Sequence, residues 1–266
     1  MKEFKNQIRW LLELIKLNIK SNLEYRTSFW MQVVGMAINN CAFLVVWYLF
    51  FQIFHSVNGW KYQDMIGLNG FVSAVFGLCF FVAYGMRRIS KYITFGQLDA
   101  YLVLPKSPLI QILFAESYVS ALGDLLFGII SLVIYCFIAH LSLGTIILLP
   151  ILFILACCTF TGFNIVGEAI AFWIPNSNEL TDALFEFMLG PSLYPNSAFT
   201  GAIRIIFTFI IPAIVVGGMP VNILLKMNPW QIILMICLSI FWLLLAKFIF
   251  DQGLKRYESG NLTGAH

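Results

Sequence analysis

The stretch RRISKYITFGQLDAYLVLPKSP, residues 87–108, is the longest polar and basic interruption between two clearly apolar runs of this chain. It is too long for a tight turn. Its basic side chains are Arg87, Arg88, Lys91 and Lys106. Because basic residues collect in the cytoplasmic loops of membrane proteins, the stretch is predicted to be a cytoplasmic loop.

This loop also carries more apolar side chains than a solvated segment would need. They are Phe95, Leu98, Tyr101, Leu102 and Leu104. We therefore expect a short helix within residues 93–104, with Gly96 near its start and with Pro105 and Pro108 ending it. A plain basic loop without a helix is the alternative.

The composition of the whole chain is that of an integral membrane protein. Of its 266 residues, 60% are hydrophobic and only 11% are charged, whereas a soluble domain is about 45–50% apolar and about 25% charged. Nearly all of the length is needed for spans and short connections. A soluble catalytic domain is therefore not expected.

Working outward from the loop, the apolar runs predict an all-α protein with six transmembrane helices in a single transmembrane domain. The predicted spans are 28–54, 65–86, 109–139, 145–173, 179–194 and 231–250. The other predicted segments are an amphipathic interfacial helix at 2–26, a re-entrant outer element at 199–226 and a cytoplasmic tail at 251–266.

The distribution of basic residues decides the number of spans. Lysines and arginines cluster before residue 27, in the loop and after residue 246, so both termini and the loop are predicted to be cytoplasmic. An even number of spans is then required, and one of two ambiguous segments, 180–194 or 202–220, cannot cross. Hydropathy alone would favour 202–220 as the crossing segment. That segment is broken by prolines and glycines, however, so we assign it as re-entrant.

Residues 2–26 have apolar side chains at steps of three and four and a basic polar face. Such a helix lies in the membrane interface, with its cations near anionic headgroups. The alternative is a helix packed on the cytoplasmic side of the same protein, and the two interpretations are compatible.

The spans contain few ionisable residues, and these are expected to have partners because buried charge is costly in a membrane. Glu116 and Glu168 should lie at similar depth near the cytoplasmic face, where Arg87 and Arg88 are candidate partners. We interpret these residues, together with Asp124, as a structural or gating charge network, and a proton relay is the alternative. The partner of Asp124 cannot be named from the sequence.

Other polar and small residues in the spans are predicted to act between helices. Asn39 and Asn40 lie near the middle of the first span. Polar amides at such depth most often bond to a neighbouring helix, so we expect this role for both, with substrate contact as the alternative. The second span is rich in glycine, which predicts close helix packing. Its glycines are Gly67, Gly70, Gly77 and Gly85.

No motif for metal or nucleotide binding is present in the sequence. The six cysteines lie in apolar runs without a CxxC pair or a Cys/His ligand spacing, so no metal site is predicted. There is no GxxxxGK[ST] loop. If ATP drives this protein, another chain must bind it.

Three stretches resemble one bacterial branch of the permease subunits of type-2 ABC exporters. They are LEYRTSFW at 23–30, FGQLDAYLVLPKSP at 95–108 and YPNSAFTGAIRIIFTFIIPAIVVGGMP at 194–220. The order of an interfacial helix, two spans, a helix-bearing cytoplasmic loop, further spans and a broken outer element is also similar to that class. The resemblance covers essentially the whole chain.

The resemblance implies that the loop forms a coupling helix, at about 88–104, which docks into a groove of a separate ATPase subunit. The residues implied in this contact are Arg88, Gly96, Leu98, Asp99, Tyr101 and Leu102. It further implies two ATPase copies that hold ATP and Mg, a second permease subunit of the same or a related chain, and surrounding membrane lipids. No cofactor bound by this chain and no nucleic acid are implied.

The implied function is transport rather than catalysis. The chain would move a hydrophobic or amphipathic substrate, such as a drug, peptide or lipid-like molecule, out across the bacterial cytoplasmic membrane by alternating access. An ion-coupled secondary transporter is one alternative, although such proteins often show internal repeats with broken helices in both halves. An intramembrane enzyme is another, and it would need a cluster of catalytic residues at one depth.

Overall fold

The structure is a computed structural model and describes residues 2–22 and 26–258. Its longer helices are α1 (Lys2–Asn22), α2 (Arg26–Ile53), α3 (Tyr62–Ala83), α7 (Ala121–Ile138), α8 (Leu143–Glu168), α9 (Asn178–Ser192), α12 (Gly218–Lys226) and α13 (Pro229–Leu254). The shorter ones are η2 (Tyr84–Arg87), α4 (Ile89–Thr94), α5 (Asp99–Leu102), α6 (Pro108–Leu113), η3 (Ala169–Phe172), η4 (Asn196–Ala198), α10 (Gly201–Ile205), the π-helical turn η5 (Ile206–Ile210) and α11 (Ala213–Val216). Part of the 23–30 motif and residues 259–266 of the predicted tail lie outside the described residues.

Five helical segments are long and apolar enough to cross a membrane. They are Thr27–Ile53, Tyr62–Thr94, Ala121–Ile138, Leu143–Phe172 and Pro229–Leu254. This confirms the prediction of an all-helical protein with several membrane-spanning candidates. Helix α9, which falls in the predicted fifth span, has 15 residues and is not one of the five.

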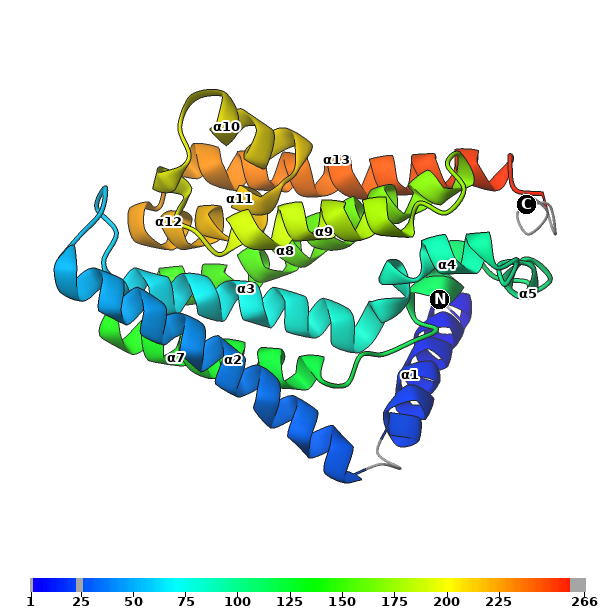
Figure 1. Ribbon diagram of the computed structural model, residues 1–266, viewed down its shortest axis with the longest axis horizontal. Helices are drawn as coiled ribbons and strands as arrows, with labels where there is room; N and C mark the ends of the chain where they lie inside the picture. Colours follow the sequence, from blue (N-terminus) through cyan, green and yellow to red (C-terminus); the bar gives the residue numbers. More distant parts are fainter. Residues whose placement is uncertain (1, 23–25, 259–266) are drawn as a thin grey trace.

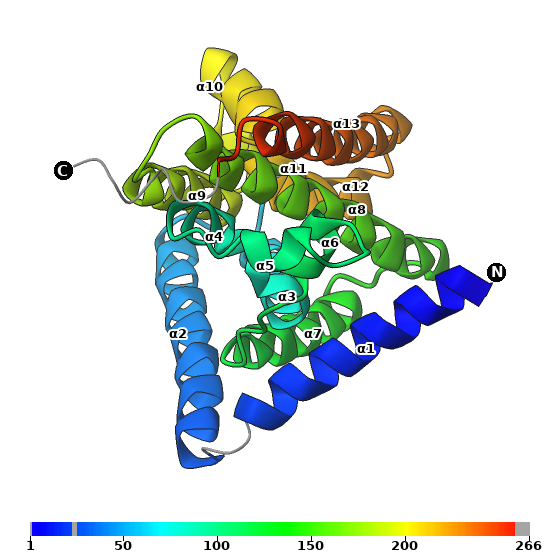
Figure 2. The same cartoon turned by 90° about the vertical axis from the view of Figure 1, so that its right-hand side faces the viewer.

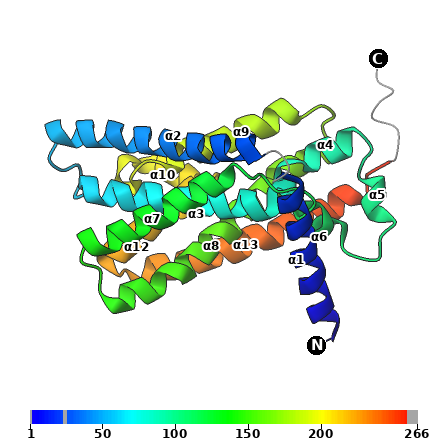
Figure 3. The same ribbon diagram turned by 90° about the horizontal axis from the view of Figure 1, so that it is seen from below.

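The long helices run side by side in one elongated bundle (Figure 1). One end of the bundle carries α1, α4, α5 and the C-terminal end of α13, and the opposite end carries α10, α11 and α12. Figure 2, viewed onto the first of these ends, shows α4, α5 and α6 grouped there. Helix α1 lies across the long axis of the bundle rather than along it (Figure 3). The location of this helix in the membrane interface stays a prediction.

The glycines of α3 allow it to pack closely against α7, as the sequence predicted. A Cβ atom added at Gly77 would lie 2.4 Å from the backbone nitrogen of Leu125, and one added at Gly128 would lie 2.4 Å from that of Ala74. Because real Cβ atoms do not approach so closely, the two helix backbones touch where side chains would otherwise hold them apart.

Aromatic rings join α9 to the rest of the bundle. The Phe76 and Phe160 ring centroids lie 4.3 Å apart, and Phe185 of α9 lies 6.0 Å from Phe76 and 5.7 Å from Phe80. Rings at these separations attract one another beyond the area that they bury. Helix α9 is therefore packed into the core formed by α3 and α8.

The predicted span 109–139 is not one helix. Helix α6 ends at Leu113, residues 114–120 are not helical, and α7 begins at Ala121. Tyr118 in the break donates its backbone N–H to the carbonyl of Phe80 at 3.0 Å. Glu116 thus lies in an irregular segment, where a carboxylate can meet partners from several elements.

The loop also differs from the single helix predicted at 93–104. It contains two short helices, α4 and α5. Gly96 lies between them with φ of +68°, a left-handed conformation that glycine adopts readily and that ends α4. Gly96 therefore separates α4 from α5.

The segment predicted as re-entrant, 199–226, is broken into α10, η5, α11 and α12. Pro212 precedes α11, and Gly217 lies so close to the Ser192 carbonyl that a Cβ atom there would be 2.0 Å from its oxygen. The proline and the close approach explain why no continuous helix forms. These short helices lie at the end of the bundle opposite α4 and α5 (Figure 1).

Candidate functional site

Arg87 connects three elements at the α4 end of the bundle. From the end of η2, its Nη1 atom lies 2.7 Å from Oε1 of Glu168, the last residue of α8. Its Nη2 atom lies 2.5 Å from Oδ1 of Asp182 in α9. Its guanidinium also lies 4.5 Å from the Phe185 ring centroid. One cation therefore holds the ends of α3, α8 and α9 together.

This ion pair is buried, since the exposed fractions of the Arg87 and Glu168 side chains are 10% and 1%. The second oxygen of Glu168 accepts a hydrogen bond from the backbone N–H of Ser90 at 3.1 Å, and the Ser90 hydroxyl lies 2.7 Å from it. A buried carboxylate satisfied by several donors is stable only in that geometry. Because Ser90 belongs to α4, the loop is fixed directly to α8.

Arg88 forms a second, more exposed cluster. Its Nε atom lies 3.1 Å from Oε2 of Glu116, and the Tyr92 hydroxyl donates to Oε1 of Glu116 at 2.7 Å. The side chains of Arg88 and Glu116 are 33% and 39% exposed. The structure thus pairs the arginines with the acids that the sequence proposed as their partners. Arg87 and Glu168 form a buried pair, and Arg88 and Glu116 form a more exposed one.

Asp124 lies apart from both pairs. The Nδ2 atom of Asn40 donates to Oδ1 of Asp124 at 2.5 Å, and the Ser73 hydroxyl donates to Oδ1 of Asn40 at 3.2 Å. These three residues belong to α7, α2 and α3. The inclusion of Asp124 in one network with Arg87 is therefore corrected, and Asn40 forms a bond between helices. The Asn39 side chain is exposed.

The residues implied in ATPase contact fall into two groups. Leu98 is fully buried, Arg88 is held by Glu116, and Tyr101 packs on Tyr92 with ring centroids 5.3 Å apart. Gly96 has open space around it, and Leu102 is 41% exposed. Leu98 therefore supports the loop from inside and cannot touch a partner.

The exposed apolar side chains of the loop form a surface that we call the loop tip. It consists of Phe95, Leu102, Val103 and Leu104. Val103 is the most exposed of them at 83%. Sequence reasoning assigned only Leu102 of this set as a contact, although the apolar run 102–104 before Pro105 was a usable signal.

Two further segments contact the loop. In α1, the Trp10 ring centroid lies 3.8 Å from Nζ of Lys106, and Asn18 donates to the carbonyl of Phe114 at 3.2 Å. After α13, Tyr257 lies beside Asp99, and burial together with that carboxylate raises the pKa of Tyr257 to about 12. Helix α1 and Tyr257, which follows α13, thus both contact the region of the loop.

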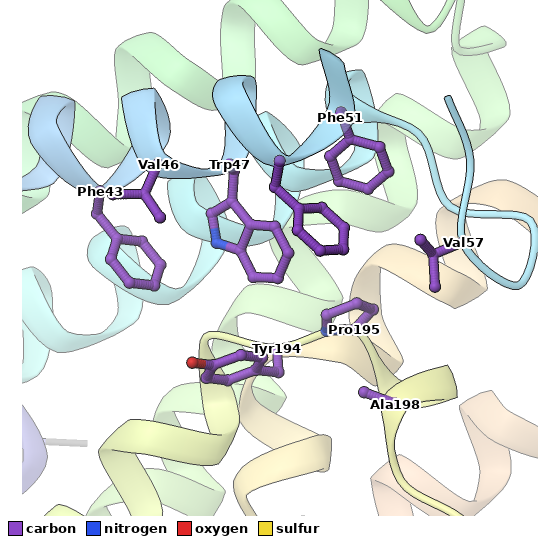
Figure 4. Close-up of a pocket in the computed structure, with 9 residues that line it drawn as sticks. Phe43, Val46, Trp47, Phe51, Val57, Tyr194, Pro195 and Ala198 are labelled. Carbon is purple, nitrogen blue, oxygen red and sulfur yellow. The ribbon is translucent and has the colours of Figure 1, made fainter. Parts of the chain in front are cut away.

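A pocket of about 360 Å³ lies between α2 and the segment that follows α9. Figure 4 shows Phe43, Val46, Trp47 and Phe51 of α2 on one side, with Tyr194, Pro195 and Ala198 opposite. The Trp47 and Tyr194 ring centroids are 5.6 Å apart. The lining is almost entirely apolar and aromatic.

A family model described as an ABC-2 family transporter protein matches residues 37–261. The chain belongs to this family. The matched range contains both arginine clusters, the loop tip and the pocket beside α2. A search of the curated proteins found no match.

In this ABC-2 protein, the sequence did not predict several residues that contact Arg87, Glu168 or Ser90. They are Ser90, Asn178, Thr181, Asp182 and Phe185. Asp182 was visible as an acid near the start of the fifth predicted span, at the same end as Arg87, and that position was the signal. Among the described residues of this ABC-2 chain, no three His, Cys, Asp or Glu side chains are placed to hold a metal ion.

Proposed function

We propose that this ABC-2 protein is the permease subunit of an ATP-driven exporter and that residues 88–104 transmit force from a separate ATPase. The observation that carries the proposal is the connection of this loop to the bundle. Ser90 in α4 contacts Glu168, and Glu168 pairs with Arg87, which also holds Asp182. A displacement of α4 would therefore act on α8 and α9 together.

The ATPase partner supplies the chemistry that this chain lacks. Two ATPase copies would hold ATP and Mg, and their closure would push on the loop tip. Exposed apolar residues such as Val103 and Phe95, at 83% and 62%, suit a hydrophobic groove on a partner. ATP-driven movement would close the cytoplasmic gate while the outer one opens, as a rigid-body switch between two states.

The proposed topology has six crossings, with both termini and the loop in the cytoplasm of a bacterial cell. Helix α9 is the fifth crossing, because its acid Asp182 stays at the cytoplasmic end with Arg87. The 199–226 segment is then re-entrant from the outer side. The basic residues of 87–108 support this orientation.

A second permease, the same chain or a related one, would complete the pathway. Of the 18 most apolar consecutive residues within Thr27–Ile53, only 11% are buried in this chain. A helix with so much free surface suits a contact with another permease, besides contact with lipid. The transport pathway would then run between the two subunits.

A hydrophobic or amphipathic cargo is proposed from the pocket beside α2. Its volume of about 360 Å³ falls within the roughly 300–1,000 Å³ typical of small-molecule sites. Nε1 of Trp47, which lines the pocket, is buried without a hydrogen-bond partner in the part of the chain that the structure describes. A cargo with an apolar body and one acceptor oxygen would match this lining.

The proposal is tested by Val103→Asp, measured for ATP-dependent transport in vesicles that contain the permease and its ATPase. We expect transport to fall by about tenfold or more, because a charge replaces apolar contact at the interface. The thermal stability of the isolated permease should not change, since Val103 is exposed. Gln97→Asp is the control, because it adds the same charge at an exposed polar position of the same loop. Full ATP-dependent transport by Val103→Asp would refute the coupling role.

A further inference from the structure

A second, smaller pocket lies at the end of the bundle opposite the loop tip. Its volume is about 190 Å³, and η4, α10, η5, α11, α12 and α13 surround it. These elements gather around the start of α13 in Figure 1. The polar residues of the lining are Asn196, Arg204, Thr208 and Gln231, and the apolar ones are Ile205, Phe209, Ile214, Met219 and Leu234.

Arg204, Asn196 and Gln231 bring hydrogen-bond donors to this pocket. Arg204 makes no ion pair with any acid whose side chain the structure describes, that is, within 9–11, 13–20 and 27–258. Asn196, which is only 6% exposed, also lines the pocket with its amide side chain. Gln231 accepts a hydrogen bond from Asn222 at 2.9 Å through Oε1, which leaves its NH₂ group to donate. Donor groups and a cation at the wall of one cavity suit a ligand that carries acceptor oxygens and negative charge.

The local backbone supports a binding role for Arg204. The helix that carries it continues as the π-helical turn η5, and such turns occur frequently at functional sites. The Thr208 hydroxyl donates to the Arg204 carbonyl at 2.6 Å across this turn. Phe209, in the same turn, lines the pocket with Arg204. The π turn therefore places a cation and an aromatic ring at one cavity.

We propose that this pocket binds the phosphate of a membrane phospholipid. A guanidinium with amide donors matches the charge and geometry of a phosphate. The volume is below that of sites for whole drug-sized molecules, so a headgroup fits and a complete cargo molecule does not. The apolar wall residues would take the beginning of the acyl chains.

The surroundings of the pocket indicate a lipid rather than a free phosphate ion. The α10–η5 segment exposes apolar side chains that suit hydrocarbon, including Ile203, Ile206 and Ile210. Trp230, next to Gln231 in sequence, is 77% exposed, and tryptophan is enriched at headgroup depth. Assignment to the outer leaflet rests on the orientation given under the proposed function, whereas the phosphate site does not.

The test is native mass spectrometry of the purified full chain in detergent, titrated with phosphatidylglycerol. Arg204→Gln should weaken binding by about tenfold or more, because it removes a charge-assisted contact. Gln231→Glu should also weaken it, since it keeps the acceptor for Asn222 and adds a negative charge. Lys226→Gln is the matched control, because it removes an exposed charge from the same end without lining the pocket. We expect it to bind as the unchanged chain does.

Two comparisons separate the lipid from other ligands. Diacylglycerol, which has the same tails without phosphate, should bind much more weakly, and inorganic phosphate should not displace phosphatidylglycerol at equal concentration. Equal binding of diacylglycerol, displacement by inorganic phosphate, or equal losses in Arg204→Gln and Lys226→Gln would overturn the proposal. The readout needs neither ATPase nor transport, so failure of the permease proposal would be seen separately.

Discussion

Arg87 and Arg88 are neighbours in sequence but differ in how much their ion pairs contribute. The Arg87–Glu168 pair is buried and reinforced by Ser90, whereas the Arg88–Glu116 pair is more than a third exposed at its acid. Breaking a buried pair leaves an uncompensated charge, which is strongly destabilising. Exposed pairs contribute little because water and salt screen them.

We therefore expect Glu168→Gln to lower the free energy of unfolding by about 3 kcal/mol, since Arg87 keeps only the pairing with the exposed Asp182. The isosteric control Glu116→Gln should cost about 1 kcal/mol or less. Unfolding of the purified chain in detergent by SDS titration measures both changes. Equal losses in the two variants would show that burial does not separate the pairs.

The sequence named the right acids and bases but could not pair them all. Arg87, Arg88, Glu116 and Glu168 share one end of the bundle because charge and span order put them there. Asp182 was not predicted as a partner of Arg87, because its depth depends on the residue at which α9 begins. Sequence periodicity does not define the start of a helix to within one turn. The pairing of Asp124 with Asn40 depends on how two separate helices are rotated about their axes relative to each other. The hydropathy pattern does not give this rotation.

At the scale of elements, the close contact of α3 and α7 is the feature most sensitive to a single methyl group. We expect Gly77→Ala to destabilise the chain by about 1–3 kcal/mol, because its Cβ would lie 2.4 Å from the Leu125 nitrogen and force the helices apart.

Gly35→Ala in α2 is the matched control, since a Cβ there has nothing within 4 Å. It should leave stability unchanged or slightly higher. Thermal unfolding in detergent compares the two variants. If Gly77→Ala melts at the same temperature as Gly35→Ala, the close packing of α3 on α7 is not as described.

Element boundaries were predicted less well than element positions. The non-helical break at 114–120 was not predicted, because the run 109–139 is apolar throughout on average. Hydropathy gives no information about a backbone hydrogen bond such as that from Tyr118 to Phe80. The loop helix was expected as one piece and is split at Gly96. The glycine-rich packing and the Pro/Gly breaks in 199–226 were foreseen, since both follow from the properties of single residues.

At the scale of the whole molecule, the account requires six crossings with the loop tip and the 199–226 segment on opposite sides. This can be measured by labelling with a membrane-impermeant maleimide in intact cells, on a background without native cysteines. We expect Val103→Cys to react only after permeabilisation, and Asn58→Cys and Trp230→Cys to react from outside.

The three positions suit this test because all are exposed in the structure. The number of crossings needs this test because α9 has only 15 residues, fewer than the roughly 20 that a helix needs to cross the hydrocarbon. If neither α9 nor the 199–226 segment crossed, Asn58→Cys and Trp230→Cys would react from opposite sides of the membrane.

The central claim is that this chain works with a separate ATPase through residues 88–104. It is tested most directly by gentle extraction from the native membrane, followed by identification of the proteins that purify with the chain. The account predicts an ATPase with a phosphate-binding loop and a second permease, and it predicts that Val103→Asp releases the ATPase. A chain that purifies without any ATPase, and transports with an ion gradient instead, would contradict it.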